Sequence, residues 1–351
     1  MENSLGVAAG LILPEHAPTP AMAAEDGLAA LAAIAGDDLD ATNRTIVARM
    51  ASPVELIPRL AAHLVAAGGK RLRPLLTLAC ARLCGYPAGG VRHVRLAACV
   101  EFIHTATLLH DDVVDESLLR RGSASANAVF GNQPSVLVGD FLFARAFQLM
   151  VEDGSLDVLA ILSRAAATIA EGEVLQLQTQ NDLSTSEARY LDVIRGKTAA
   201  LFAAACEVGA VVASRPPAER AALAAYGHDL GIAFQLVDDA LDYAADQAAL
   251  GKAVGDDFRE GKITLPVLLA CASGGAEERA FWQRTIEANE QTDADLQHAL
   301  DLMQRCDAIT QTLARAAGFA STAKSALAVF PASHARAALL DAADYTVSRG
   351  R

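Results

Sequence analysis

The stretch LLHDDVVDES, residues 108–117, places three aspartates inside an apolar run. They are Asp111, Asp112 and Asp115. Like charges four residues apart on a helix repel each other by roughly a few tenths of a kcal/mol, and burial among leucine and valine side chains would raise that cost. The stretch therefore predicts a helix whose carboxylates are compensated by cations.

A second stretch, QLVDDALDY at residues 235–243, repeats the DDxxD spacing far along the chain, with Asp238, Asp239 and Asp242. On a helix the outer aspartates of each motif lie one turn apart on one face. If the two helices face each other across a cavity, their carboxylates converge, and hard divalent cations such as Mg²⁺ neutralise such a group. Because Mg²⁺ completes its coordination with substrate phosphates, the motifs also predict a phosphorylated ligand.

Polar residues precede both motifs at helical spacing. His104 lies two turns before Asp111, and Gln235 lies about one turn before Asp238. The alternative interpretation of an acidic run is a solvated helix face or a helix end, and a single DDxxD is usually explained in that way. Two copies with matching apolar flanks favour a binding site.

The stretch GGKRLRP, residues 68–74, supplies positive charge. Pro74 suits the first turn of a helix, and the residue before a proline is kept out of the α region. Lys70, Arg71 and Arg73 are therefore expected near a helix N-terminus, which is an anion-binding arrangement. The alternative is a basic surface loop.

Further residues that could contact phosphate oxygens lie near the acidic motifs or follow glycines. They are Arg120 and Arg121 in LLRRGSAS, Lys197 and Thr198 in RGKTAALF, and Lys252 and Lys262 in LGKAVGDDFREGKITLP. Arginine forks bind phosphate well, so this grouping predicts a diphosphate pocket. A Walker-type nucleotide site and a serine nucleophile are not expected, because neither GxxxxGKS/T after a strand nor GxSxG occurs.

The composition predicts the fold class. Of 351 residues, 52% are hydrophobic and 5% aromatic, with abundant Ala and Leu, which favours helices packed on helices. Helical spacing of apolar residues from about residue 26 predicts roughly ten helices. Residues 1–24 show no sustained helical pattern and are expected to be a flexible leader. Residues 25–351 are expected to form one all-α domain, because no linker interrupts them.

Charge and cysteine content exclude several classes of protein. The net charge of −13, from 29 basic and 42 acidic residues, argues against a nucleic-acid binder. The six cysteines lack zinc-ligand spacing and are expected to be buried free thiols. Neither an apolar stretch of about 18 residues nor a signal-peptide pattern is found, so a cytoplasmic protein is expected.

Five segments together closely resemble, in order, the motifs of the trans-polyprenyl diphosphate synthases: GGKRLRP, LLHDDVVDES with the RRG that follows, GKTA, FQLVDDALDY and GKAVGDDFREGKITLP. The resemblance covers about residues 40–351. EFIHTATLLHDDVVDES and ANAVFGNQPSVLVGDFLFARAFQLM resemble the long-chain bacterial enzymes that make octaprenyl or decaprenyl diphosphate. The resemblance implies an all-α, single-domain helical bundle around a central cavity, of the isoprenoid synthase type, and a homodimer.

The resemblance also implies the roles of the site residues. About three Mg²⁺ ions that bridge the allylic diphosphate are assigned to Asp111, Asp115, Asp238 and Asp242. Asp112 and Asp239 are implied as further ligands or as supports of the ligands. Isopentenyl diphosphate is assigned to Lys70, Arg73, His104 and Arg121. The allylic diphosphate is assigned to Arg120, Lys197, Thr198, Gln235, Lys252 and Lys262, and oxygens of Lys197, Thr198 and Gln235 are implied to stabilise a cation.

The implied reaction is chain elongation. The metals would stabilise charge on the departing diphosphate, so that the allylic C–O bond ionises, isopentenyl diphosphate attacks and a proton is lost. The expected primer is farnesyl or geranylgeranyl diphosphate and the expected product is a C40–C50 polyprenyl diphosphate for ubiquinone, with at most peripheral membrane contact through that product. Ala106 and Thr107 are expected to line the cavity about 6 Å below the metals, where bulky rings stop shorter chains.

Two alternatives remain. A non-catalytic partner subunit of a heteromeric synthase usually loses one aspartate motif, whereas both are complete here. A terpene cyclase shares the first aspartate motif and the helical fold, but it binds no second diphosphate, which would leave GGKRLRP without a ligand.

Overall fold

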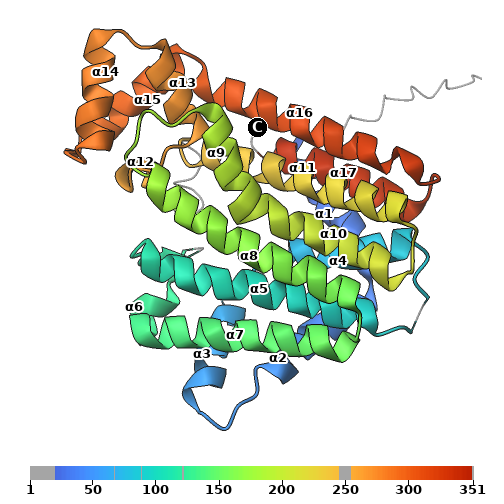
Figure 1. Ribbon diagram of the computed structural model, residues 1–351. Coiled ribbons are helices and arrows are strands. Elements are labelled where there is room, and N and C mark those ends of the chain that lie inside the picture. The colour runs from blue at the N-terminus through green and yellow to red at the C-terminus, as the bar shows by residue number, and fades with distance from the viewer. Residues whose placement is uncertain (1–19, 67, 88, 121, 245–253, 350–351) are drawn as a thin grey trace, which may run out of the picture.

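The computed structural model describes residues 20–66, 68–87, 89–120, 122–244 and 254–349. Within these ranges the chain is helical except for loops and one short hairpin, in which β1 (Leu119–Arg120) pairs antiparallel with β2 (Ser123–Ala124) (Figure 1). The all-α fold class predicted from the sequence is confirmed.

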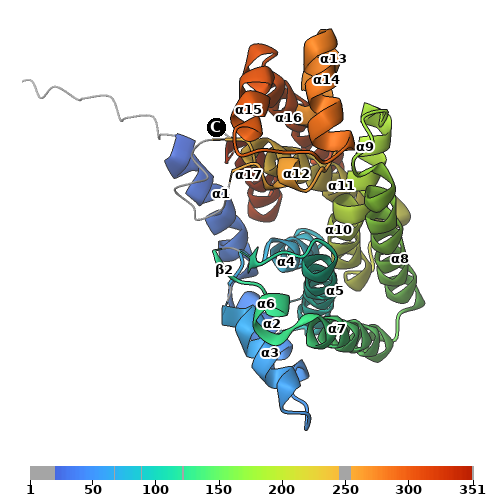
Figure 2. The ribbon, with the colours of Figure 1, turned by 90° about the vertical axis from the view of Figure 1, so that its left-hand side faces the viewer.

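Six helices form the centre of the bundle: α4 (Leu72–Leu83), α5 (Arg92–Val114), α7 (Asn132–Asp153), α8 (Leu156–Thr179), α10 (Ala200–Val212) and α11 (Pro217–Leu241). α5 packs along α7, and α10 packs against α4, α8 and α11. Figure 2 looks nearly along several of these helices and shows α5 and α7 on one side and α8 and α10 on the other. Small residues allow this close packing, because Ala97, Ala98, Ala146 and Ala205 are fully buried between the helices.

The remaining helices surround this centre. They are α1 (Pro20–Ala35), α2 (Asp37–Arg49), α3 (Leu56–Ala66), α6 (Ala126–Phe130), α9 (Glu187–Ile194), α12 (Asp256–Arg259), α13 (Leu265–Ser273), α14 (Ala276–Trp282), α15 (Asp295–Arg305), α16 (Ala308–Ala326) and α17 (His334–Ser348). Short non-α turns occur at η1 (Arg195–Ala199) and η3 (Gln283–Glu287), both π-helical, and at η4 (Leu327–Val329), which is a 3₁₀ turn. α1 lies along α17, and α16 lies along α11.

Local sequence explains where the long helices turn. α7 is followed by Gly154, whose φ of 75° is in the left-handed region that favours glycine. Ser155 then caps α8, because its hydroxyl accepts a hydrogen bond from the Val158 backbone N–H at 3.3 Å. The stretch EDGS, residues 152–155, thus forms a tight turn between two antiparallel helices.

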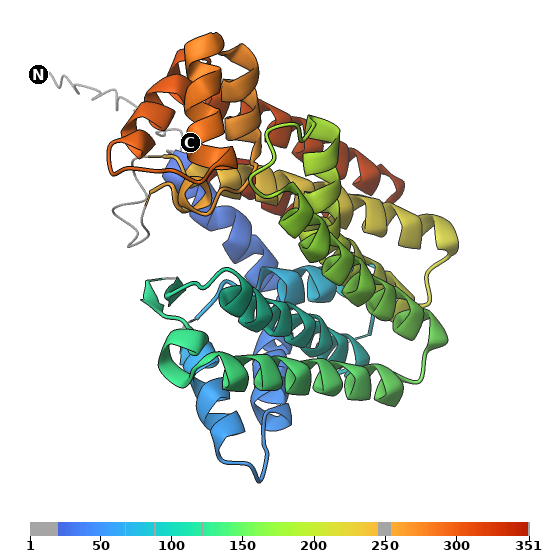
Figure 3. The same ribbon diagram turned by 60° about the vertical axis from the view of Figure 1, so that its left-hand side comes forward.

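A separate small core holds α13 to α15 at one end of the molecule (Figure 3). The rings of Phe258, Phe281 and Trp282 pack together, and Trp282 is 1% exposed. Arg284 donates to both carboxylate oxygens of Asp295 at 2.7 and 2.9 Å. This cluster anchors α12 and the loop before α13, and therefore fixes one wall of the site described below.

Three sequence-based expectations differ from the structure. α1 begins at Pro20, so residues 20–24 are helical rather than leader, and residues 1–19 lie outside the described residues. The helices are also more numerous than the ten or so expected, because short helices fill what the pattern left as loops. The sequence analysis expected no membrane-spanning stretch, whereas among the described residues α7 alone is long and apolar enough to cross a membrane by length and composition. Of its most apolar 18-residue segment, 39% is buried inside the protein. The six cysteines are free as expected, four of them buried and two half-buried.

Candidate active site

Both acidic motifs stand at the C-terminal end of a long helix. Asp111 and Asp112 lie in the last turn of α5 and Asp115 is its C-cap, while Asp238 lies near the end of α11 and Asp242 is the C-cap of that helix. The C-terminal end of a helix carries partial negative charge, so carboxylates are disfavoured there. Two acidic helix ends in one region therefore require cations nearby.

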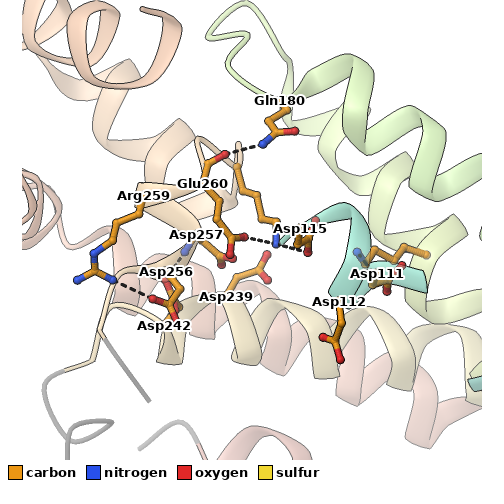
Figure 4. Close-up of polar contacts among 12 residues, drawn as sticks. Asp111, Asp112, Asp115, Gln180, Asp239, Asp242, Asp256, Asp257, Arg259 and Glu260 are labelled. Atoms are coloured by element: carbon orange, nitrogen blue, oxygen red, sulfur yellow. Dashed lines mark hydrogen bonds and ion pairs between the residues drawn. The ribbon is translucent and has the colours of Figure 1, made fainter. Parts of the chain in front are cut away.

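Lysines from later segments provide part of that charge. Lys262 Nζ lies 2.9 Å from Asp115 Oδ2 and 2.5 Å from Glu260 Oε2. Figure 4 shows the side chains of Asp115 and Glu260 close to each other. Lys197 Nζ lies 2.8 Å from Glu173 Oε2 and 3.7 Å from Asp111 Oδ2. Burial opposes the charge on Lys262, but the carboxylates around it outweigh that effect and raise the pKa of its ammonium group. The carboxylates around Lys197 likewise raise its pKa, so both ammonium groups stay charged beside the end of α5.

Several carboxyl groups of the site hold their protons more tightly than usual. Burial, with Asp257 close by, raises the pKa of Asp242 to about 8. Burial also raises the pKa of Glu173 to about 7, although Lys197 acts in the opposite direction. In the described part of the chain no three His, Cys, Asp or Glu side chains lie close enough together to hold one metal ion. The four aspartates assigned to metal ions therefore do not form one preformed ligand cluster, and two of them, Asp111 and Asp115, lie near lysines instead.

Asp112 lies apart from the carboxylates that contact Lys197 and Lys262. Its side chain is 3% exposed and accepts two hydrogen bonds from the Arg120 guanidinium, one of them from Nε at 2.9 Å. Asn127 Nδ2 donates to the Asp112 carbonyl oxygen at 3.0 Å. The structure thus places Arg120, which the resemblance assigned to the allylic diphosphate, against Asp112. Arg121 and Lys252, assigned to the two diphosphates, lie outside the described residues.

The GGKRLRP segment leads into α4, which begins at Leu72, two residues before Pro74. The Arg73 guanidinium lies 3.1 Å from His104 Nε2, so two residues assigned to isopentenyl diphosphate are adjacent. Lys70 Nζ donates to the Tyr345 hydroxyl on α17.

Arg71 differs from its neighbours in this segment. It is the N-cap of α4, with a left-handed φ of 49°, and pairs with the buried carboxylate of Glu101 on α5. This ion pair fixes the turn that presents Lys70 and Arg73, while the Arg71 charge itself is already neutralised.

The remaining assigned residues meet beside the π-turn η1. Gly172 of α8 and Gly196 of η1 pack so closely that a Cβ added to Gly172 would lie 2.5 Å from the Lys197 backbone nitrogen. π-turns occur frequently at functional sites. This close approach places Lys197 and Thr198 against a cavity of about 90 Å³, whose other lining residues include Tyr190, Gln235, Asp239 and Lys262.

Comparison with known proteins identifies the family. Residues 54–303 match the model of the polyprenyl synthetase family. The chain belongs to the polyprenyl synthetase family. It is 47% identical over 318 residues to the octaprenyl diphosphate synthase of Escherichia coli K12, covering 91% of this chain and 98% of that protein.

Solved structures agree with this assignment. A polyprenyl synthase from Caulobacter crescentus CB15, complexed with calcium and isoprenyl diphosphate, superposes with a TM-score of 0.89 at 56% identity and covers 92% of this chain and 98% of that one. A decaprenyl diphosphate synthase from Rhodobacter capsulatus gives a TM-score of 0.87 at 54% identity, with 92% and 99% covered. The protein is thus a prenyltransferase of this family, and its relatives place it with the long-chain members.

The sequence did not identify several residues of this polyprenyl synthetase site. Glu173 and Tyr190 are single polar residues in helical segments, and no short motif distinguishes them from ordinary surface or core residues. Arg349 stacks on the Phe234 ring at 3.9 Å and lies 3.7 Å from Asp238 Oδ1, although it is 111 residues away in sequence. Only the fold brings these residues to the motifs.

The two residues expected to control chain length in this synthetase have different surroundings. Ala106 is fully buried in the core shared by α5 and α7. Thr107 is half-buried, one turn before Asp111, and its hydroxyl donates to the His104 carbonyl oxygen at 2.8 Å. Their effect on product length remains a prediction.

Proposed function

We propose that this protein condenses isopentenyl diphosphate successively onto farnesyl or geranylgeranyl diphosphate and releases a C40–C50 polyprenyl diphosphate for the ubiquinone side chain. The observation that carries the proposal is that Lys262 pairs with Asp115 and Lys197 with Asp111 at the acidic end of α5, beside a cavity that Gln235 and Asp239 of α11 also line. The relatives named as octaprenyl and decaprenyl diphosphate synthases support a long product.

The donor groups of the site fit Mg²⁺. Asp111 and Asp115 on α5, and Asp238 and Asp242 on α11, offer only hard oxygen ligands, and Mg²⁺ usually takes one or two carboxylates and leaves its other positions to water and phosphate. Among the residues that the structure describes, no three ligands cluster, which agrees with ions that also need the substrate diphosphate. When bound, Mg²⁺ would neutralise charge that develops on the leaving diphosphate. The bound calcium of the Caulobacter relative supports a divalent ion.

The chain's own residues would then bind the two substrates and stabilise the positive charge. Arg73 and His104, 3.1 Å apart, would hold isopentenyl diphosphate beside the start of α4. Lys197 and Lys262 would exchange their carboxylate partners for the allylic diphosphate. Thr198, which lines the cavity, would place an oxygen near the carbon at which positive charge develops.

We also propose that the protein is a homodimer that pairs through the outer face of α7. Leu137, Phe147 and Val151 fall on one side of this helix and are 66%, 45% and 69% exposed, and Val174 on the neighbouring α8 is 57% exposed. An apolar face of this kind is usually an interaction site, and two-fold pairing of identical faces is the commonest way to cover it. Light scattering of Leu137→Glu/Val151→Glu should give monomers, whereas Val329→Glu, at an exposed position elsewhere, should leave dimers.

One incubation tests the proposed reaction. Pure protein with farnesyl diphosphate, labelled isopentenyl diphosphate and Mg²⁺ should give labelled C40–C50 products when the chains are sized. A terpene cyclase would instead convert the allylic diphosphate without incorporating label. A non-catalytic subunit would give no product until a second protein was added, so either result would reject the proposal. We also propose that the protein is cytoplasmic, with at most peripheral membrane contact through its product. Cell fractionation would test this location.

A further inference from the structure

A chain of hydrogen bonds links a buried tyrosine to the cavity. The Tyr190 hydroxyl on α9 donates to Asp239 Oδ2 at 2.6 Å, and Gln235 Nε2 donates to Asp239 Oδ1 at 2.7 Å. Thr198 Oγ1 then donates to Gln235 Oε1 at 2.8 Å. Tyr190, Asp239 and Thr198 are 3%, 4% and 5% exposed, so water cannot easily replace these partners.

Burial raises the pKa of Asp239 to about 7. In the ionised form of Asp239, the chemistry of the four groups fixes the direction of every bond. Both oxygens of Asp239 already accept, one from the phenol and one from the amide. Because the NH₂ group of Gln235 is used on Asp239, its carbonyl oxygen must face Thr198, and a carbonyl only accepts. The Thr198 hydroxyl therefore directs its single proton toward Gln235 and leaves only lone pairs for the cavity that it lines.

We propose that Tyr190 is a positioning residue that, through Asp239 and Gln235, holds the Thr198 hydroxyl with its oxygen lone pairs toward the reacting allylic carbon. The proposal rests on the proposed function, because a developing carbocation is what an oriented oxygen dipole would stabilise. A dipole that is already oriented needs no reorganisation when the charge appears.

The structure also shows why the tyrosine is needed. Without its hydroxyl, Oδ2 of Asp239 would be buried with one partner fewer, and a buried acceptor that loses its donor is costly. The carboxylate would turn toward another donor, and the Gln235 amide would lose the anchor that decides which of its ends faces Thr198. Thr198 could then point its proton into the cavity, where it would repel positive charge.

A double-mutant cycle tests this role. Tyr190→Phe removes one oxygen atom and should lower kcat about tenfold, with both KM values within about twofold of wild type. In a Thr198→Val background, the same change should lower kcat by less than about twofold, because the hydroxyl that it orients is already absent. Gln235→Met, which interrupts the chain at its middle, should show the same non-additivity with Thr198→Val.

Tyr226→Phe is the matched control. Tyr226 is fully buried and its hydroxyl donates to the Leu339 carbonyl oxygen at 2.6 Å, away from the cavity. It should lower the Tm about as much as Tyr190→Phe while leaving kcat unchanged. If the effects of Tyr190→Phe and Thr198→Val on kcat simply multiply, or if Tyr226→Phe lowers kcat equally, the inference is overturned. If wild-type protein makes no polyprenyl diphosphate at all, the proposed function fails instead.

Discussion

Lys262 Nζ lies 2.9 Å from Asp115 Oδ2, although the two residues are 147 positions apart in the sequence. The contact joins the end of α5 to the loop between α12 and α13 and closes one side of the site. A buried ammonium group beside a helix-end carboxylate offsets charge that the helix dipole disfavours. The same position suits the phosphate oxygens of a substrate, for which Lys262 would exchange its carboxylate partner.

The raised carboxyl pKa values predict that Mg²⁺ stabilises the protein more at high pH. The pKa of Asp242 is about 8 and that of Glu173 about 7, against ordinary values of 3.8 and 4.5. Between about pH 4 and 8 the folded protein therefore holds more protons than the unfolded chain, so the free energy of unfolding falls as the pH rises. Mg²⁺ needs deprotonated ligands and displaces these protons.

Thermal unfolding at about pH 6 and about pH 8.5, with and without Mg²⁺ and diphosphate, checks this linkage. The metal-free Tm should be lower at the higher pH, and the rise in Tm on adding Mg²⁺ should be larger there. An Mg²⁺ effect that is the same at both pH values would contradict the assignment of Asp242 to the metal site.

Replacing either outer aspartate should nearly abolish turnover. Asp111→Asn or Asp238→Asn removes a charged ligand but keeps the size of the side chain, and each should lower kcat at least a thousandfold, or about 4 kcal/mol of transition-state stabilisation. Asp344→Asn is the matched control, because Asp344 pairs with Lys324 on the surface of α17. Near-normal kcat in both site variants would rule out the metal assignment.

The two diphosphate subsites should separate kinetically. Arg73 lies against His104 near the start of α4, whereas Lys197 lies near Asp111, two turns farther along α5. Arg73→Ala should raise the KM for isopentenyl diphosphate more than that for the allylic substrate, and Lys197→Ala should do the reverse. Steady-state kinetics with each substrate varied in turn measures both constants, and equal changes in both variants would refute this division.

The sequence could predict features that depend on local spacing. A DDxxD motif puts its outer aspartates on one helix face wherever the helix lies, so the shared face followed from the pattern, whereas the position of both motifs at helix ends did not. Asp112 is one residue, or about 100°, around the helix from Asp111, and it pairs with Arg120 on another side. The resemblance left Asp112 as a further ligand or a support, and its contact with Arg120 favours the role of a support.

Tertiary packing decides what the sequence could not show. The ion pair of Lys197 with Glu173 and the hydrogen bond of Tyr190 to Asp239 each join residues on different helices. Nothing in the local sequence of Glu173 or Tyr190 differs from that of an ordinary helix. The sequence also could not show that Lys197 and Lys262 lie near Asp111 and Asp115 at the end of α5.

Product length provides the last prediction. Ala106 and Thr107 precede Asp111 by five and four residues, at a level about 6 Å below the acidic side chains. Small side chains at this level leave room for a growing apolar chain, so Ala106→Tyr and Thr107→Phe should both yield active enzymes whose products shorten to about three or four isoprene units. Thin-layer or mass-spectrometric sizing of the products measures this shift.

The two variants should differ in stability. Ala106 is fully buried between α5 and α7, so Tyr there must displace packed side chains and should lower the Tm by the equivalent of about 1–3 kcal/mol. Thr107 is half-buried, so Phe there should be tolerated with a smaller loss. Either variant that stays folded and active but still makes full-length chains would show that the floor of the cavity lies at another level of α5 or α7. Ile103 and Leu149 are then the next positions to substitute with larger residues, because both are fully buried in the same core.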